Sequence, residues 1–211
     1  AYGINYYNFQ YDRILSVAYK LGLTVFNKYG GYRKGVKDDI SDRVLVAVFA
    51  VLSPNNHENT NYIALDQCLK IWCRLLPETA KVPAYGANKA KALRMLREYS
   101  TVMLAGGKPL DYDPWDTLTG QKVRSFYHNT IWPKADTCIT IDGHMKSAWL
   151  GRRVLLKRAG EVSPALYLEI SQAICELADK YETTAPGFQA GLWIGWRHHI
   201  AAPGQYWLQL W

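Results

Sequence analysis

The chain contains the stretch Leu118-Thr-Gly-Gln-Lys122-Val-Arg-Ser-Phe126, in which a polar turn opens a helical segment. Thr119 and Gly120 predict the turn. Residues 121–131 then predict a helix that carries Lys122 in its first turn. Backbone N–H groups at such a turn can hold a phosphate, although a lone glycine between helices is more often a plain helix end. The helix dipole and some desolvation favour the uncharged amine of Lys122, which could then act as a nucleophile; a solvated lysine is the simpler interpretation.

A second polar motif, Thr140-Ile-Asp142-Gly-His144-Met, follows that helix. Asp142 stands between a short apolar run and the next helical segment, which is the position of an N-cap. A carboxylate fixed at a helix start can also stabilise a developing oxocarbenium ion on a sugar. His144 lies in the same first turn, where it can meet a phosphate, although a surface or packing histidine is its ordinary role.

The overall composition permits a polyanionic partner but does not require one. The 211 residues include 25 lysines and arginines and 18 acidic residues, giving a net charge of +7 at pH 7. Four cysteines are scattered without a paired motif, so we expect no zinc site, no iron–sulfur cluster and no cofactor. The longest apolar run, Val44 to Leu52, is too short to cross a bilayer, and we see no signal peptide. We therefore expect a cytoplasmic protein without membrane contact.

The spacing of apolar residues is mostly helical and predicts an all-α fold. Ser41 predicts the N-cap of an apolar, buried helix, and Asn88 predicts the N-cap of a later one. The run from Val44 to Phe49 is also prone to form a strand, and the sequence leaves that alternative open. The expected helices cover residues 12–28, 42–52, 58–76, 89–99, 121–131, 144–158, 163–181 and 185–199.

Lys122 and Asp142, in this order and context, resemble the helix-hairpin-helix DNA glycosylases. In that family a hairpin of the type Leu-Pro-Gly-Val-Gly-x-Lys precedes Val-Asp-x-His. This chain has Leu118-Thr-Gly-Gln-Lys122 followed by Ile141-Asp142-Gly-His144. The hairpin lacks the Pro-Gly-Val-Gly core and Asp142 is followed by glycine. The resemblance covers roughly residues 40–200 and is nearest to the 8-oxoguanine glycosylase and endonuclease III types, as a distant branch that would fit a phage origin.

The resemblance extends to segments on both sides of this pair. Ser53-Pro-Asn55-Asn56 is similar to a Ser-Ser-Asn-Asn loop, which implies that Asn55 fills the gap left by a flipped base. Gln189-Ala-Gly-Leu-Trp193 is similar to a Gln-Ala-x-Leu-Phe segment, which implies a base pocket built from an amide and a ring. An aromatic core helix explains the same spacing equally well. The other implied DNA contacts are Asn56, Thr119, Gly120, Gln121, His144 and Arg197.

For the fold, the resemblance implies a two-lobed helical glycosylase-like domain with its active site in the cleft between the lobes. This single domain would span residues 1–211, with a helical lobe at about 40–110 and a hairpin and catalytic lobe at about 111–160. Residues 1–39 and 161–211 would pack around them as helices. The implied partner is double-stranded DNA with a damaged or modified base, bound by a monomer.

The implied activity is glycosylase and AP lyase chemistry. Lys122 would attack C1′ of a flipped nucleotide and expel the base, while Asp142 would stabilise positive charge on the sugar. The amide and ring favour an oxidised purine such as 8-oxoguanine, with a modified pyrimidine such as 5-hydroxymethyluracil next. Two alternatives stay open: an enzyme of the same fold that processes hypermodified bases in phage DNA, and a non-catalytic DNA-binding module.

Overall fold

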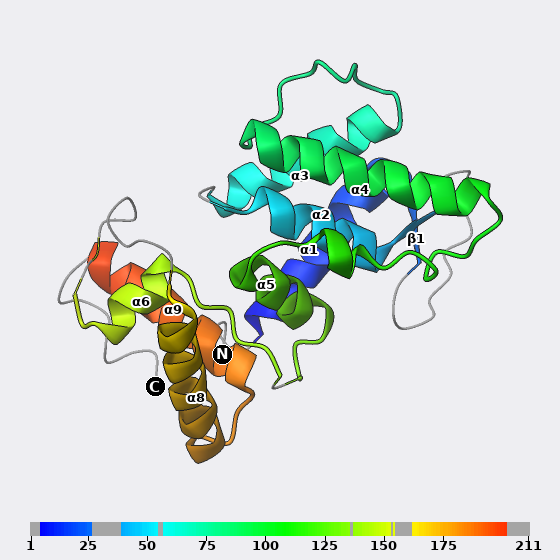
Figure 1. Cartoon of the computed structure of the whole chain (residues 1–211). Coiled ribbons are helices and arrows are strands. Elements are labelled where there is room, and N and C mark those ends of the chain that lie inside the picture. Colours follow the sequence, from blue (N-terminus) through cyan, green and yellow to red (C-terminus); the bar gives the residue numbers. More distant parts are fainter. Residues whose placement is uncertain are drawn as a thin grey trace. The chain divides into compact units, whose positions relative to one another are not determined.

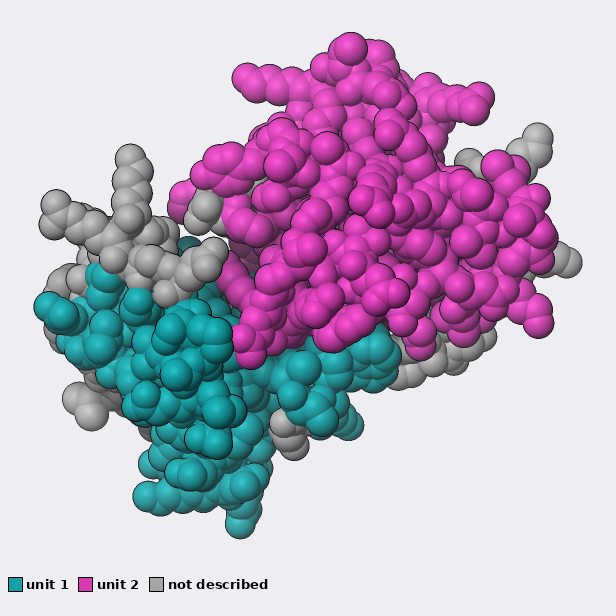
Figure 2. All heavy atoms as spheres, viewed as in Figure 1, with its two compact units in different colours: residues 1–9, 128–211 teal, residues 10–127 magenta. Residues whose placement is uncertain are grey.

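The computed structural model describes residues 5–26, 39–54, 57–135, 137–152, 154 and 162–201. These residues are mostly helical (Figure 1), which confirms the helical class. The chain divides into two compact units, shown in Figure 2: unit 1 comprises residues 1–9 and 128–211, and unit 2 comprises residues 10–127. The limits fall inside helices α1 (Tyr6–Lys20) and α5 (Gln121–Ile131), so each of these helices contributes to both units. The bounds of α5 are those predicted.

Unit 2 is built around helix α2 (Asp42–Leu52), in which every residue except Arg43 is buried. It packs against α3 (Glu58–Trp72) and α4 (Gly86–Leu104). The Ser41 hydroxyl accepts the Arg43 backbone N–H at 3.2 Å, so the predicted N-cap is confirmed and the strand alternative for this run is wrong. Full burial of a leucine or valine stabilises a fold by about 1.5–3 kcal/mol, which makes α2 the main contributor to this core.

Helix α1 ends at Lys20, so the predicted helix over residues 12–28 is wrong at both ends. Gly22 adopts a left-handed φ of 75°, and the Leu23 N–H bonds to the Ala18 carbonyl at 3.1 Å. This is a common way for a helix to end, because glycine accepts the left-handed conformation without a Cβ clash.

The residues after this turn form a small sheet that the sequence analysis did not predict. Strand β1 (Thr24–Phe26) pairs in parallel with β2 (Asp39–Ser41), and Val25 lies opposite Ile40. Both of these apolar residues are buried. The pairing joins segments that are separated in sequence, so helical periodicity could not reveal it.

Helix α3 ends at Trp72 instead of the predicted residue 76. Arg74 takes a left-handed φ of 60°, and the Leu75 N–H bonds to the Lys70 carbonyl at 2.8 Å. The ending has the same geometry as that of α1, but no glycine or proline marks it in the sequence.

Helix α4 is longer than the predicted range of residues 89–99, and Asn88 is not its N-cap. The Lys89 N–H donates to the Tyr85 carbonyl at 2.9 Å, so the helix is already under way at Asn88. Tyr85 is the N-cap residue and provides no side-chain capping bond. A side-chain cap strengthens a helix start but is not required for one.

Unit 1 contains helices α6 (Gly143–Trp149), α8 (Pro164–Lys180) and α9 (Ala185–Ala201). Helix α9 packs against both α6 and α8. The Ser163 hydroxyl caps α8 by accepting the Leu166 N–H at 3.3 Å. The buried core of this unit consists of Ile139, Ile141, Met145, Tyr167, Ile170, Ile174, Ala178, Ala185 and Phe188.

Helix α6 is shorter than the predicted helix over residues 144–158. Gly151 adopts a φ of 62°, and its N–H bonds to the Ala148 carbonyl at 3.1 Å, which ends the helix. Residues 153 and 155–161 of the predicted range lie outside the described residues.

We expect Leu45→Ala, in the fully buried α2, to lower the free energy of unfolding by about 2–5 kcal/mol, because it removes buried surface and leaves a cavity. Urea denaturation followed by far-UV circular dichroism measures the loss. Leu104→Ala is the matched control, because Leu104 is 89% exposed and should change stability by less than about 0.5 kcal/mol. Equal losses for the two variants would contradict a core centred on α2.

Candidate functional site

The predicted turn before Lys122 is present in unit 2. Gly120 adopts a left-handed φ of 83°, and α5 begins at the next residue. The element before the turn is the short 3-10 helix η1 (Pro114–Thr117), so the first helix that a helix-hairpin-helix arrangement would require is only four residues long. The first N–H groups of α5 have no acceptor within the helix, which suits the turn to anion binding.

Basic side chains brace this turn. Lys91 on α4 donates through Nζ to Thr119 Oγ1 at 2.5 Å. Arg124 donates through Nε to the Leu118 carbonyl at 2.9 Å, and its guanidinium lies 5.2 Å from the centre of the Trp115 ring. Thr119, Gly120 and Gln121 remain exposed. The turn is therefore held from both sides while its tip faces solvent.

Lys122 is half-buried in the first turn of α5, at the place predicted. It belongs to unit 2, whereas Asp142 belongs to unit 1. The contacts of each predicted catalytic residue are therefore described within its own unit.

Asp142 is the N-cap of α6, as predicted. Its Oδ1 atom accepts the backbone N–H groups of His144 at 2.9 Å and Met145 at 3.0 Å. Its Oδ2 atom accepts the indole Nε1–H of Trp193 at 3.2 Å. Both carboxylate oxygens are thus held by hydrogen bonds, which fixes the plane of the carboxylate.

Three more predicted residues gather beside this carboxylate. The guanidinium of Arg197 lies 4.5 Å from the centre of the Trp193 ring, and the His144 ring meets that ring edge-on at 6.3 Å. Tyr6, which the sequence analysis did not select, lies 5.8 Å from the same ring. We call these five residues, Tyr6, Asp142, His144, Trp193 and Arg197, the Asp142 cluster.

The second predicted base-pocket residue, Gln189, is only 3% exposed. Its Oε1 atom accepts the hydroxyl of Tyr7 at 2.7 Å. Burial raises the pKa of Tyr7 to about 12, so this hydroxyl remains a donor at neutral pH. Tyr7 was missed by sequence reasoning, because it stands 182 positions from Gln189 and carries no motif of its own.

The segment that leads into Asp142 is pinned from two helices of unit 1. The Tyr167 hydroxyl donates to the Ile139 carbonyl at 2.5 Å and accepts the Ile141 N–H at 3.2 Å. Asn129 donates through Nδ2 to Thr140 Oγ1 at 3.0 Å. All of these contacts are buried, so the segment is a rigid support for the cap residue.

Two predicted DNA-binding residues, Asn55 and Asn56, lie outside the described residues. The preceding Ser53 ends α2, and its hydroxyl donates to the Phe49 carbonyl at 2.8 Å.

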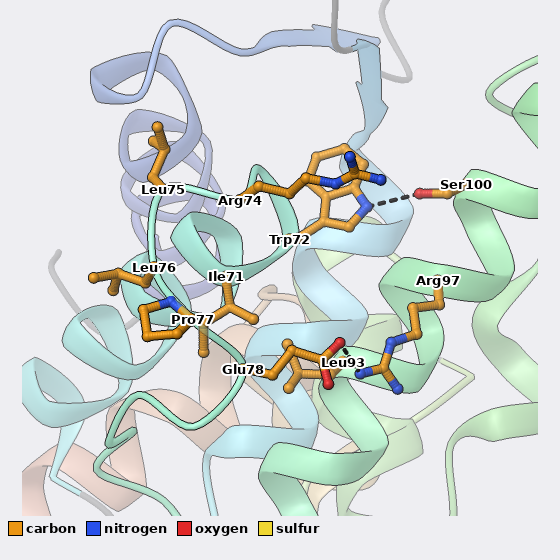
Figure 3. Close-up of a pocket in the computed structure, with 10 residues that line it drawn as sticks. All are labelled: Ile71, Trp72, Arg74, Leu75, Leu76, Pro77, Glu78, Leu93, Arg97 and Ser100. Carbon is orange, nitrogen blue, oxygen red and sulfur yellow. Dashed lines mark hydrogen bonds and ion pairs between the residues drawn. The ribbon is translucent and has the colours of Figure 1, made fainter.

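A pocket of about 700 Å³ lies at the turn between α3 and α4 (Figure 3). Four of its polar side chains are paired: Trp72 donates to Ser100 Oγ at 2.7 Å, and Arg97 pairs with Glu78 at 2.6 Å. The left-handed Arg74 at its edge follows from the ending of α3. Of the predicted site residues that the structure describes, none lines this pocket.

The described residues show neither a metal-binding group nor a membrane span. Among them, no cluster of three or more histidine, cysteine, aspartate or glutamate side chains could hold a metal ion. No helix in this part of the chain combines the length and the apolar character needed to cross a bilayer.

The comparison with family models matches residues 35–200 to DUF7178, a family of unknown function. The chain belongs to the DUF7178 family. No curated protein and no solved structure gives a significant match. The DUF7178 match includes Lys122, Asp142, Gln189 and the α9 side of the Asp142 cluster. It leaves out all of α1, so Tyr6 and Tyr7 contact Trp193 and Gln189 from outside the matched segment.

The raised pKa of Tyr7 predicts a pH dependence of stability for this DUF7178 member. Folding favours the protonated hydroxyl of Tyr7. Its contribution to the free energy of unfolding is therefore present below pH 10 and is lost as the pH rises from about 10 to about 12. Phenylalanine cannot ionise. Over that pH range, we therefore expect the free energy of unfolding of Tyr7→Phe to fall by about 2 kcal/mol less than that of the wild type. Urea denaturation at a series of pH values measures the difference.

Other buried tyrosines set the background of this experiment. Burial also raises the pKa of Tyr112 to about 12 and that of Tyr127 further, so part of the alkaline loss should persist in Tyr7→Phe. Tyr181→Phe, at a residue 55% exposed, is the control. Parallel curves for wild type and Tyr7→Phe would show that Tyr7 is not the buried donor described above.

Proposed function

We propose that the protein is a DNA glycosylase that excises a damaged or modified base and also acts as an AP lyase. The observation that supports this best is the Asp142 cluster. A helix-capping carboxylate, an aromatic ring and an exposed arginine meet there, close to the buried amide of Gln189 on the same helix as the ring. A fixed carboxylate suits stabilisation of a cationic sugar, and a ring beside an amide suits recognition of a base.

The proposed chemistry begins with Lys122. Its uncharged amine attacks C1′ of the flipped nucleotide, forming an N–C1′ bond as the glycosidic bond breaks, and the base leaves with a proton. Ring opening gives an imine, from which β-elimination breaks the 3′ C–O bond. Asp142 stabilises the positive charge that develops on the sugar and assists the proton transfers.

The remaining predicted residues are proposed to bind the DNA. Gln189 and Trp193 hold the base, and Asn55 fills the vacancy next to Asn56. The exposed turn contacts a backbone phosphate, as do His144 and Arg197. The turn residues are Thr119, Gly120 and Gln121.

The proposal also includes a finer fold assignment, a two-lobed helix-hairpin-helix glycosylase fold with its active site in a cleft. It further includes a monomeric state, a cytoplasmic location and a role in base excision repair.

The Tyr7 hydrogen bond bears on which base would be recognised. Because Gln189 Oε1 accepts the Tyr7 hydroxyl, the Nε2 group is the part of the amide left to donate to a base edge. This favours a base that offers an acceptor there, such as the carbonyl groups of an oxidised purine like 8-oxoguanine. A modified pyrimidine such as 5-hydroxymethyluracil also carries carbonyl acceptors and is the next candidate.

The first test is borohydride trapping on duplexes that each carry one modified base or an abasic site. We expect a covalent adduct with one of them, because borohydride reduces the imine formed by Lys122. The adduct should disappear in Lys122→Gln and persist in Lys108→Gln, a substitution of an exposed lysine in the same unit. An adduct that survives in Lys122→Gln would overturn the assignment of the nucleophile.

The absence of an adduct on every duplex, with no release of free base, would reject the glycosylase. Mass analysis of the digested DNA would then detect the product of a base-modifying enzyme as an altered nucleoside. DNA binding without any product would indicate a non-catalytic module.

Asp142→Asn tests the carboxylate separately from the fold. Asparagine caps helices about as well as aspartate, so the backbone bonds to residues 144 and 145 should survive. We expect single-turnover base release to fall about 100-fold or more, because the negative charge facing the sugar is lost. An unchanged far-UV circular dichroism spectrum is the control for folding, because the Trp193 bond to Oδ2 is lost in this variant. Near-normal turnover would remove Asp142 from the mechanism.

A further inference from the structure

The hydrogen bond between Trp193 and Asp142 suggests a role that base stacking alone does not include. The backbone N–H groups of His144 and Met145 both bind Oδ1, so they fix one oxygen of the carboxylate. Rotation about the Cβ–Cγ bond moves Oδ1 and Oδ2 together, so a bond to either oxygen restrains both. The indole Nε1–H of Trp193 donates to Oδ2 at 3.2 Å and is therefore a third restraint on this rotation, from a different helix.

The ring of Trp193 is itself held in place by its neighbours. Arg197, one helical turn further along α9, lies 4.5 Å from the ring centre, while Tyr6 and His144 approach at 5.8 and 6.3 Å. A guanidinium over an indole is a favourable contact, and it covers part of one ring face. Trp193 is thus a constrained donor, and an incoming base would have to use the other face or displace Arg197.

We propose that Trp193 is a positioning residue for Asp142, and that it links base binding to the orientation of the carboxylate. This inference rests on the proposed function. A base that settles against Trp193 presses on the same rigid ring whose N–H holds Oδ2. A correctly placed base would leave that bond and the carboxylate orientation intact, whereas a poorly fitting base would displace the ring and misalign the carboxylate. Such coupling gives discrimination at the chemical step as well as at binding.

Trp193→Phe is the informative variant, because it keeps an aromatic ring but removes the Nε1–H donor. We expect single-turnover base release to fall about 10- to 100-fold, while affinity for lesion-containing DNA changes less than about threefold. The matched control is Trp196→Phe on the same helix. Trp196 is buried, and its indole nitrogen donates no hydrogen bond to Asp142. Equal turnover losses in the two variants, or a loss confined to affinity, would overturn the positioning role.

A second measurement decides the inference even if the protein is not a glycosylase. In a ¹⁵N spectrum, the Trp193 indole N–H signal is identified by its absence in Trp193→Phe. We expect Asp142→Ala to move that signal by several tenths of a ppm in the proton dimension and to speed its exchange with solvent, because its acceptor is lost.

The indole of Trp72 provides the internal control for this spectrum. It bonds to Ser100 in unit 2, so its signal should not move in Asp142→Ala. An unmoved Trp193 signal would refute the positioning role whatever the activity. If the Trp193 signal moves but the protein releases no base, the Trp193–Asp142 interaction is supported and only the proposed reaction is rejected.

Discussion

In unit 1, the candidate site depends on the carboxylate of Asp142, which bonds to helices α6 and α9. It starts α6 through two backbone N–H bonds and receives a third bond from α9 through Trp193. Charge-assisted bonds of this kind are stronger than bonds between neutral groups, and a partly buried setting strengthens them further. The carboxylate therefore joins two helices that the chain separates by about fifty positions.

That junction needs a fixed support, which the preceding segment provides. Tyr167 holds the backbone of residues 139 and 141 through one hydroxyl, and Asn129 holds Thr140. These contacts are buried among apolar side chains, where leaving a polar group unpaired would cost about 1–3 kcal/mol. The segment of residues 139–141, which precedes Asp142, is thus held firmly against the buried core of unit 1. In unit 2, the buried helix α2 supports α5 through the contact between the rings of Phe49 and Phe126, whose centres lie 6.0 Å apart.

Local signals in the sequence were sufficient for part of this arrangement. Ser41 and Asp142 cap the helices that follow them, as predicted, because a short oxygen-bearing side chain can accept the first free N–H groups of a helix. The same signal was wrong at Asn88, which lies inside α4. The start of α5 followed from the turn at Thr119 and Gly120. The ends of α1 and α3 were misjudged for different reasons. Gly22 was a visible stop signal, whereas the turn that follows α3 has an arginine, Arg74, in the left-handed conformation that glycine favours.

The contacts between distant segments could not be predicted from single residues. Tyr7 meets Gln189 across 182 positions, and neither residue carries a pattern that names the other. The same holds for the pairing of β1 with β2, where three residues on each side are too few for a periodic signal. Such contacts depend on how whole elements pack, so a sequence motif can name Gln189 as a candidate without showing that a tyrosine fixes its amide.

Capping alone would account for the presence of an aspartate at position 142, so the cap by itself says little about catalysis. Serine, threonine and asparagine would cap α6 about as well. What capping does not explain is the rest of the cluster. An indole directs its only donor at the second carboxylate oxygen, and an exposed guanidinium covers that indole. A purely structural cap needs neither group. A carboxylate that must face a reacting sugar at a set angle needs the first, and a site that receives DNA benefits from the second.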